Sequence, residues 1–268
     1  MRVPEAVSDN IVFIGSVQNN KPKWKGTAFF VALETPRSQQ TYLVAPKHIV
    51  AGLSKDWCVR VNLAGDTSTT VSLSQDSAVW YYHPSDDAAD VAVLEWPGVA
   101  DQQYRFCEES MLLTPEMAAE ESVSAGDQLF IVSLFTRAID KGGGRNEPIV
   151  RSGVLSLSRP ISLPVPGGVS TELYLAETRS FGGMSGSPVY VAETIQFKDG
   201  DYKFDPLGPW YLMGMMRGHW KIPVEQLDEY DFVGSEGVNL GISLVTPAHK
   251  ILETLRQPDL TKRTAASL

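Results

Sequence analysis

The segment Ser180–Val189, Ser-Phe-Gly-Gly-Met-Ser-Gly-Ser-Pro-Val, places Ser185 among three glycines. Glycine can adopt positive φ angles and lets a substrate approach the backbone closely. A nucleophilic serine needs that exposure, and it needs N–H groups aimed at the developing oxyanion. The N–H groups of Gly183 and Ser185 are the candidates for this oxyanion hole. The alternative is a tight hairpin turn that carries an unreactive serine.

A related pattern, G-x-S-x-G, also presents a nucleophilic serine, but Ser187 occupies its final glycine position here. That pattern requires a strand, a turn and a helix in succession. Pro188 is instead followed by Val-Tyr-Val, which is typical of a strand. The segment therefore does not fit the nucleophile elbow of α/β-hydrolases.

A candidate general base lies at the end of the run Leu43-Val-Ala-Pro-Lys-His-Ile-Val, where His48 begins a short turn or helix. The chain has four histidines in all. Histidine is the most frequent general base near neutral pH because its ordinary pKa lies close to 7. The alternative for His48 is a structural loop histidine.

A candidate carboxylate partner, Asp90, stands where the polar segment His83-Pro-Ser-Asp-Asp-Ala-Ala-Asp runs into the apolar strand Val-Ala-Val-Leu. A buried carboxylate at that point could orient an imidazole and stabilise its charged form. Asp86 and Asp87 are interpreted as solvated loop acids. The alternative for Asp90 is a cap of the strand or turn.

The three candidates follow one another in the order His, Asp, Ser. Subtilisin-like enzymes have the order Asp, His, Ser, and α/β-hydrolases have Ser, acid, His, whereas chymotrypsin-like enzymes have the order found here. Only the chymotrypsin order fits all three segments.

With these three motifs in this order, the chain resembles the trypsin-like serine protease family over roughly residues 10 to 255. The segments that carry the resemblance are Gly26–Val31, Leu43–Val50, Asp90–Leu94, Gly183–Pro188 and Gly241–Pro247. The likeness is to the bacterial and viral branches without the disulfide set. It implies a catalytic triad of His48, Asp90 and Ser185, acyl transfer without a metal or organic cofactor, and a site between two β-barrels. Met184 stands where digestive members have an aspartate, so activation by pairing with a newly cut N-terminus is not expected.

The resemblance also implies an S1 pocket, the site for the substrate side chain before the cut bond. By position its lining comprises Arg179, Ser180, Met216, Arg217 and His219. Arg179 at the base would favour an acidic substrate side chain through a charge-assisted pair. The alternative is that Arg179 pairs with Glu177 or points to solvent.

The bulk composition fits one large or two small β domains. The chain has 268 residues, a formal net charge of -9 and two cysteines, Cys58 and Cys107. An acidic surface disfavours nucleic acid as a partner. No apolar run is long enough to span a membrane. With few cysteines and no secretory signal pattern, we expect a cytoplasmic protein with reduced thiols.

Short apolar runs bounded by turn residues predict an all-β fold, with two six-stranded antiparallel β-barrels and a short C-terminal helix. Residues 1–110 are expected to form the N-terminal barrel with His48 and Asp90, residues 111–256 the C-terminal barrel with Ser185 and the helix, and residues 257–268 a fraying polar tail. Helices are predicted at Thr246–Leu255 and Pro115–Ser122, a hairpin at Lys198–Gly208, a turn at Val165–Gly168 and a loop at Lys141–Arg145. The predicted strands are Ile11–Val17, Gly26–Leu33, Thr41–Val44, Cys58–Leu63, Val71–Leu73, Ala78–Tyr82, Val91–Glu95, Gln128–Leu134, Val150–Leu157, Glu172–Ala176, Pro188–Val191, Trp210–Met216 and Asn239–Val245.

The sequence thus predicts a serine endopeptidase that acts on protein or peptide substrates. Because an uncontrolled cytoplasmic protease would be harmful, narrow specificity or gated activity, with a regulatory protein partner, is part of the hypothesis. The main alternative is a catalytically silent binding module on a protease fold. An esterase with the same triad and a nonenzymatic β-sandwich receptor are the further alternatives.

Overall fold

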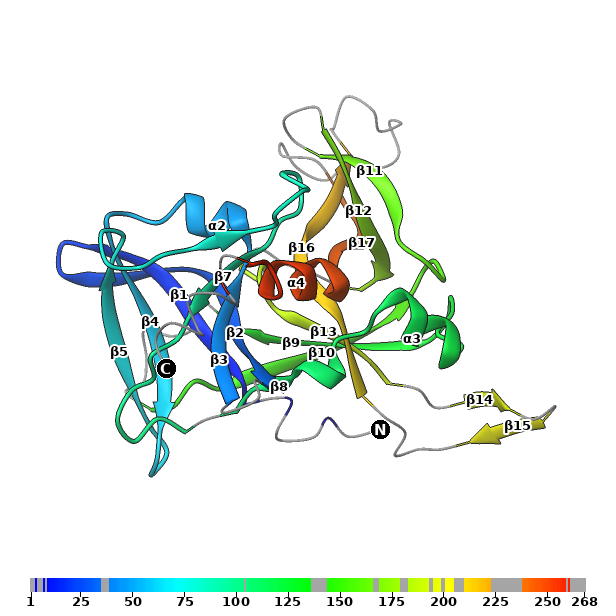
Figure 1. The fold of residues 1–268 in the computed structure, drawn as a ribbon, viewed down its shortest axis with the longest axis horizontal. Coiled ribbons are helices and arrows are strands. Elements are labelled where there is room, and N and C mark those ends of the chain that lie inside the picture. Colours follow the sequence, from blue (N-terminus) through cyan, green and yellow to red (C-terminus); the bar gives the residue numbers. More distant parts are fainter. Residues whose placement is uncertain are drawn as a thin grey trace.

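A computed structural model describes residues 3, 7, 9–34, 39–103, 105–135, 144–165, 169–178, 183–192, 195–198, 201–204, 210–222, 238–258 and 260. Two β-sheets lie side by side, with the C-terminal helix between them (Figure 1). The predicted loop at Lys141–Arg145 and the turn at Val165–Gly168 fall largely outside the described residues.

The N-terminal sheet has the order β5-β4-β1-β2-β3-β7-β6, and β8 pairs with β2. All of its pairs are antiparallel except β2–β8. Six of its strands have four or more residues, as the prediction of six strands requires, and two more have only two residues each. The strands are β1 (Ile11–Gln18), β2 (Lys21–Glu34), β3 (Gln39–Ala45), β4 (Asp56–Leu63), β5 (Thr67–Ser74), β6 (Tyr81–Tyr82), β7 (Ala92–Glu95) and β8 (Cys107–Glu108).

The C-terminal sheet has the order β10-β9-β13-β16-β17-β12-β11, and β10 also pairs with β12. This extra pairing closes a ring of six strands and leaves β11 outside it. A separate hairpin of β14 and β15 extends from this barrel (Figure 1). The strands are β9 (Gln128–Leu134), β10 (Pro148–Leu155), β11 (Ile161–Val165), β12 (Val169–Glu177), β13 (Pro188–Ala192), β14 (Ile195–Lys198), β15 (Asp201–Phe204), β16 (Trp210–Ile222) and β17 (Val238–Pro247).

The helices are short. They are α2 (Lys47–Ala51), α3 (Pro115–Glu120) and α4 (Ala248–Leu255), with a 3₁₀ turn at Glu109–Met111. α3 begins where the Thr114 side chain accepts a hydrogen bond from the Met117 N–H at 3.3 Å. α4 begins two residues later than predicted, because Pro247 is extended and still belongs to β17. None of the helices in the described residues has the length and apolar character needed to cross a bilayer.

Three groups of buried apolar side chains hold the molecule together. One fills the N-terminal barrel around Trp57 and Leu43, and a second fills the C-terminal barrel around Leu129 and Leu155. The third draws side chains from both barrels and from one face of α4, including the fully buried Ile251. This shared core fixes the two barrels relative to each other, because burial of apolar surface is the main favourable term in packing.

Four local predictions need correction. The predicted hairpin at Lys198–Gly208 is instead the β14–β15 pair, which begins three residues earlier. β8 and β11 were not predicted as strands. The tail was expected to fray from residue 257, but the Gln257 side chain donates to the Tyr82 carbonyl at 3.2 Å and Leu260 is buried, whereas residues 259 and 261–268 lie outside the described residues. The division between domains at residue 110 stays a prediction.

Candidate active site

His48 and Asp90 meet at one end of the N-terminal barrel. β3 ends at Ala45, and Pro46 then starts α2, which carries His48 in its first turn. Asp90 lies two residues before β7, the strand that pairs with β3. The His48 Nδ1 and the Asp90 Oδ2 are 2.7 Å apart, and the His48 backbone N–H donates to Asp90 Oδ1 at 2.9 Å. Both carboxylate oxygens are therefore used to hold the same histidine.

The Asp90 carboxylate is ionised although its side chain is only 3% exposed. Burial acts to raise the pKa of Asp90, but the hydrogen bonds and charge of His48 and the charge of Arg217 together outweigh it and hold the pKa below its ordinary value. An ionised carboxylate can only accept hydrogen bonds. The proton of a neutral His48 ring therefore lies on Nδ1, and its Nε2 is free to accept a proton.

Ser185 lies in a turn that leads into β13 and is fixed to the other barrel. Its carbonyl accepts the Thr27 N–H of β2 at 3.0 Å. The flanking Gly183 and Gly186 have φ angles of 103° and 88°, a region that other residues rarely adopt. A Cβ atom on Gly186 would lie 1.8 Å from the Thr27 carbonyl oxygen. The turn thus requires glycine both for its backbone angles and for its close contact with β2.

The same contact brings the serine turn beside α2. A Cβ atom on Gly26 would lie 2.8 Å from the Ser185 carbonyl oxygen and 3.5 Å from the Ile49 side chain. A Cβ atom on Gly186 would lie 2.9 Å from Pro46. The beginning of the His48 helix and the serine turn therefore flank one stretch of β2.

The Ser185 hydroxyl points toward β16 in this conformation. It donates to the Arg217 carbonyl at 3.2 Å. Both Ser185 and His48 are described, and no hydrogen bond joins them. Such bonds are often long in an enzyme without substrate and tighten only when substrate binds. The N–H groups of Gly183 and Ser185 donate to no acceptor among the described residues.

Arg217 connects the serine turn to the loop that carries Asp90. While its carbonyl accepts the Ser185 hydroxyl, its guanidinium donates to the Ala88 carbonyl at 3.1 Å. The sequence placed Arg217 in the wall of the S1 pocket, but its side chain extends to the opposite barrel. Sequence reasoning did not find this contact, because the two partners are 129 residues apart in the chain.

Of the other four residues predicted to line the S1 pocket, two lie on β16 and two lie outside the described residues. Met216 is buried in the core of the C-terminal barrel, and its backbone pairs with the serine turn. His219 is partly exposed on β16, opposite Ser243. Arg179 and Ser180 lie outside the described residues.

An open pocket lies next to the segment that leads to Arg179. Its volume is about 750 Å³. The pocket is lined by Ile149, Val150, Arg151, Ser152, Glu177, Thr178 and Gly241.

In the described residues, no three His, Cys, Asp or Glu side chains are grouped so that they could hold a metal ion.

Asp86 was interpreted as a solvated loop acid, and this interpretation was wrong. Its Oδ1 accepts the N–H groups of Ala88 and Ala89 at 3.0 and 3.1 Å, and its Oδ2 lies 3.2 Å from the Lys250 Nζ. Burial acts to raise the pKa of Asp86, but Lys250 and the other hydrogen bonds lower it below its ordinary value. Asp87 is fully exposed, as expected.

Comparison with known proteins shows the fold. No protein-family model and no curated protein matches the chain. Among solved structures, Deg5 is similar with a TM-score of 0.51 and 16% identity, over 91% of this chain and 86% of Deg5. The HtrA-type protease AlgW, a serine-to-alanine variant with a tripeptide, has a TM-score of 0.51 and 17% identity, over 94% of this chain and 61% of AlgW. The chain therefore has the double β-barrel fold of trypsin-like serine proteases.

Proposed function

We propose that this chain is a serine endopeptidase in which His48, Asp90 and Ser185 form a catalytic triad. The observation that carries the proposal is the 2.7 Å contact between the His48 Nδ1 and the buried Asp90 carboxylate. It fixes the tautomer that a general base requires, beside a glycine-rich turn whose serine carbonyl is bonded to the same barrel.

In the proposed reaction, the His48 Nε2 takes the proton of the Ser185 hydroxyl as Oγ attacks a peptide carbonyl. Asp90 stabilises the imidazolium that forms. The N–H groups of Gly183 and Ser185 donate to the oxyanion of the tetrahedral intermediate. His48 then protonates the leaving amine, and water releases the acyl group from Ser185 by the reverse sequence of proton transfers.

For the first step the Ser185 hydroxyl must leave the Arg217 carbonyl and turn to His48. A rotation about one side-chain bond changes the direction of a serine hydroxyl, and such rotations are fast. Because this rotation is fast, the orientation of the hydroxyl does not by itself gate the reaction, and a bound substrate would select the productive rotamer. Gated activity through a regulatory protein stays a prediction. The second candidate function, a catalytically silent binding module that keeps the protease fold, is favoured by the missing hydrogen bond between Ser185 and His48.

The substrates proposed are proteins or peptides with an acidic side chain before the cut bond. Arg179 is the cation proposed for the pocket base. The Arg217 guanidinium is engaged with the Ala88 carbonyl, so it is a poorer candidate for that role. Exclusion of nucleic acid and membranes as partners, and a cytoplasmic location, stay predictions.

Cleavage of a peptide library, with fragments identified by mass spectrometry, tests the proposal. We expect new peptide termini that disappear in Ser185→Ala. Ser187→Ala is the matched control, because the Ser187 hydroxyl is buried and has no hydrogen-bond partner among the described residues. Cleavage after basic residues would contradict the substrate preference. Equal fragments from wild type and Ser185→Ala would contradict the triad, and binding of peptides without cleavage would favour the silent module.

A further inference from the structure

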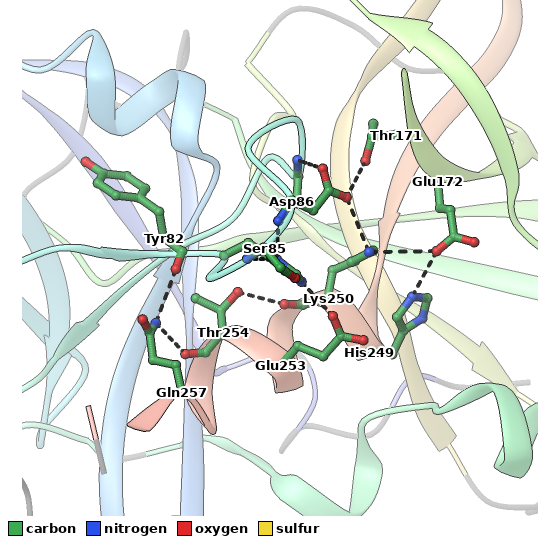
Figure 2. Close-up of polar contacts among 12 residues, drawn as sticks. Tyr82, Ser85, Asp86, Thr171, Glu172, His249, Lys250, Glu253, Thr254 and Gln257 are labelled. Carbon is green, nitrogen blue, oxygen red and sulfur yellow. Dashed lines mark hydrogen bonds and ion pairs between the residues drawn. The ribbon is translucent and has the colours of Figure 1, made fainter. Parts of the chain in front are cut away.

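The C-terminal helix α4 contacts the loop that carries Asp90, although the two belong to different ends of the chain. Figure 2 shows Lys250 and Glu253 on α4 extending toward this loop, which runs from His83 to Asp90. The Lys250 Nζ lies 3.2 Å from the Asp86 Oδ2, and the Glu253 Oε2 lies 2.6 Å from the His83 Nε2. The loop is therefore held at its beginning and at its middle by one helix.

The His83 ring makes hydrogen bonds through both of its nitrogen atoms. The His83 side chain is 2% exposed, and its Nδ1 accepts the backbone N–H groups of Ser85 and Asp86. A ring nitrogen that accepts hydrogen bonds carries no proton, so the proton of this ring lies on Nε2 and is donated to Glu253. The beginning of the loop is thus oriented by the loop's own backbone on one side of the ring and by α4 on the other.

Asp86 transmits the position of Lys250 to the residues just before Asp90. One carboxylate oxygen faces Lys250 and the Thr171 hydroxyl, each at 3.2 Å. The other oxygen accepts the N–H groups of Ala88 and Ala89, which closes the turn that ends at Asp90. A shift of this carboxylate would therefore shift the turn and the Asp90 side chain with it.

The Lys250–Asp86 pair is well shielded from water. The exposed fractions of its side chains are 13% and 22%. By contrast, the surface pair Lys55–Asp76 has exposed fractions of 71% and 72%. Exposed pairs are screened and contribute little, whereas shielded pairs keep more of their attraction. This difference makes the Lys250–Asp86 pair suited to hold a loop.

We propose that Lys250 is a positioning residue for Asp90, acting through the Asp86 carboxylate. The inference rests on the proposed function for its effect on the reaction, but not for its effect on the geometry of the His48–Asp90 pair. α4 would then have two roles, since its apolar face joins the barrels and its polar face sets the carboxylate of the site.

The test replaces Lys250 with Met, which keeps the apolar length of the side chain and removes its charge. We expect the rate of covalent labelling by a fluorophosphonate probe to fall about ten- to a hundredfold, because small misplacements of catalytic groups cost rates of this order. Lys250→Arg should restore most of the rate. Glu172→Gln is the matched control: Glu172 contacts Lys250 and His249 at the same interface but does not touch the Asp90 turn.

A second readout does not depend on catalysis. In protein labelled with ¹⁵N-histidine, the proton between the His48 Nδ1 and Asp90 gives a far-downfield resonance that reports their hydrogen bond. We expect this resonance to move or broaden in Lys250→Met, and to be unchanged in Glu172→Gln. A wild type that stays unreactive toward the probe, alone and with an added peptide or partner, would refute the proposed function while leaving this measurement able to test the positioning role.

Asp86→Asn provides a second route if Lys250→Met does not fold. The amide keeps an oxygen for the Ala88 and Ala89 N–H groups but loses the charge that attracts Lys250. We expect the same change in the His48 resonance, and no further change in the double variant. An unaltered resonance in whichever of these variants folds would overturn the inference, as would a rate loss that leaves the resonance unchanged.

Discussion

Replacement of Asp90 with Asn changes one atom of the carboxylate and should remove the general base. In the wild type, the His48 backbone N–H donates to Asp90 Oδ1 at 2.9 Å, and the amide oxygen of the variant can still accept this hydrogen bond. The amide NH₂ then takes the place of Oδ2, 2.7 Å from the His48 Nδ1. Because the NH₂ group can only donate, Nδ1 must become the acceptor and the ring proton must move to Nε2. In this tautomer His48 cannot accept the proton of Ser185.

The same tautomer change in a Ser-His-Asp triad lowers kcat by about 10⁴-fold. At about 1.36 kcal/mol per factor of ten, this corresponds to about 5.4 kcal/mol of lost transition-state stabilisation. The assay is the second-order rate constant for labelling of Ser185 by a fluorophosphonate, which needs no knowledge of the natural substrate. We expect a loss of about 10⁴-fold for Asp90→Asn.

Asp87→Asn is the matched control, because the Asp87 side chain is three residues away and fully exposed. It should label at the wild-type rate. Labelling of folded Asp90→Asn within tenfold of wild type would refute the role of Asp90 in setting the tautomer.

Three further predictions concern the framework of the site. Gly186→Ala should unfold at a clearly lower urea concentration than Gly65→Ala. Both glycines have positive φ, which costs other residues about 1–2 kcal/mol. Only at Gly186 would the added Cβ atom also overlap the Thr27 carbonyl. Equal midpoints would contradict the required close contact. The lowered pKa of Asp86 means that its ionised form stabilises the folded chain above the ordinary pKa of about 3.9, and that this stability is lost as pH falls through the folded-state pKa. Urea unfolding of Asp86→Asn should therefore show a weaker loss of stability on acidification than wild type, and an identical pH dependence would refute it. Ile251→Ala, in the core shared by both barrels, should lower the free energy of unfolding by about 2–5 kcal/mol; a loss below about 1 kcal/mol in the same denaturation assay would mean that α4 does not join them.

The strands were predictable where the pattern is local. The predicted strand Gln128–Leu134 has the bounds of β9, because its apolar run is buried almost throughout. β11 was missed because only its last residue, Val165, is buried and because it contains Pro164, which disfavours a strand. Its place at the end of the sheet explains why proline is tolerated there.

The residues proposed for the triad were identified from three local motifs and their order in the chain. Their supports were not identifiable in this way. Arg217 meets Ala88, and Lys250 meets Asp86, only because the two barrels pack against each other. No local pattern marks such partners, so Asp86 was assigned to solvent and the contact between Arg217 and Ala88 was not predicted. Both contacts depend on how the two barrels pack.

Labelling with a fluorophosphonate, followed by peptide mass spectrometry, tests the central claim most directly. The proposed triad predicts a covalent adduct on Ser185 that is absent in Ser185→Ala and strongly reduced in His48→Ala. A gated enzyme would give this adduct once a peptide substrate or partner is added. A folded chain that forms no adduct on Ser185 under either condition, or one whose His48→Ala variant labels at the wild-type rate, would contradict the account.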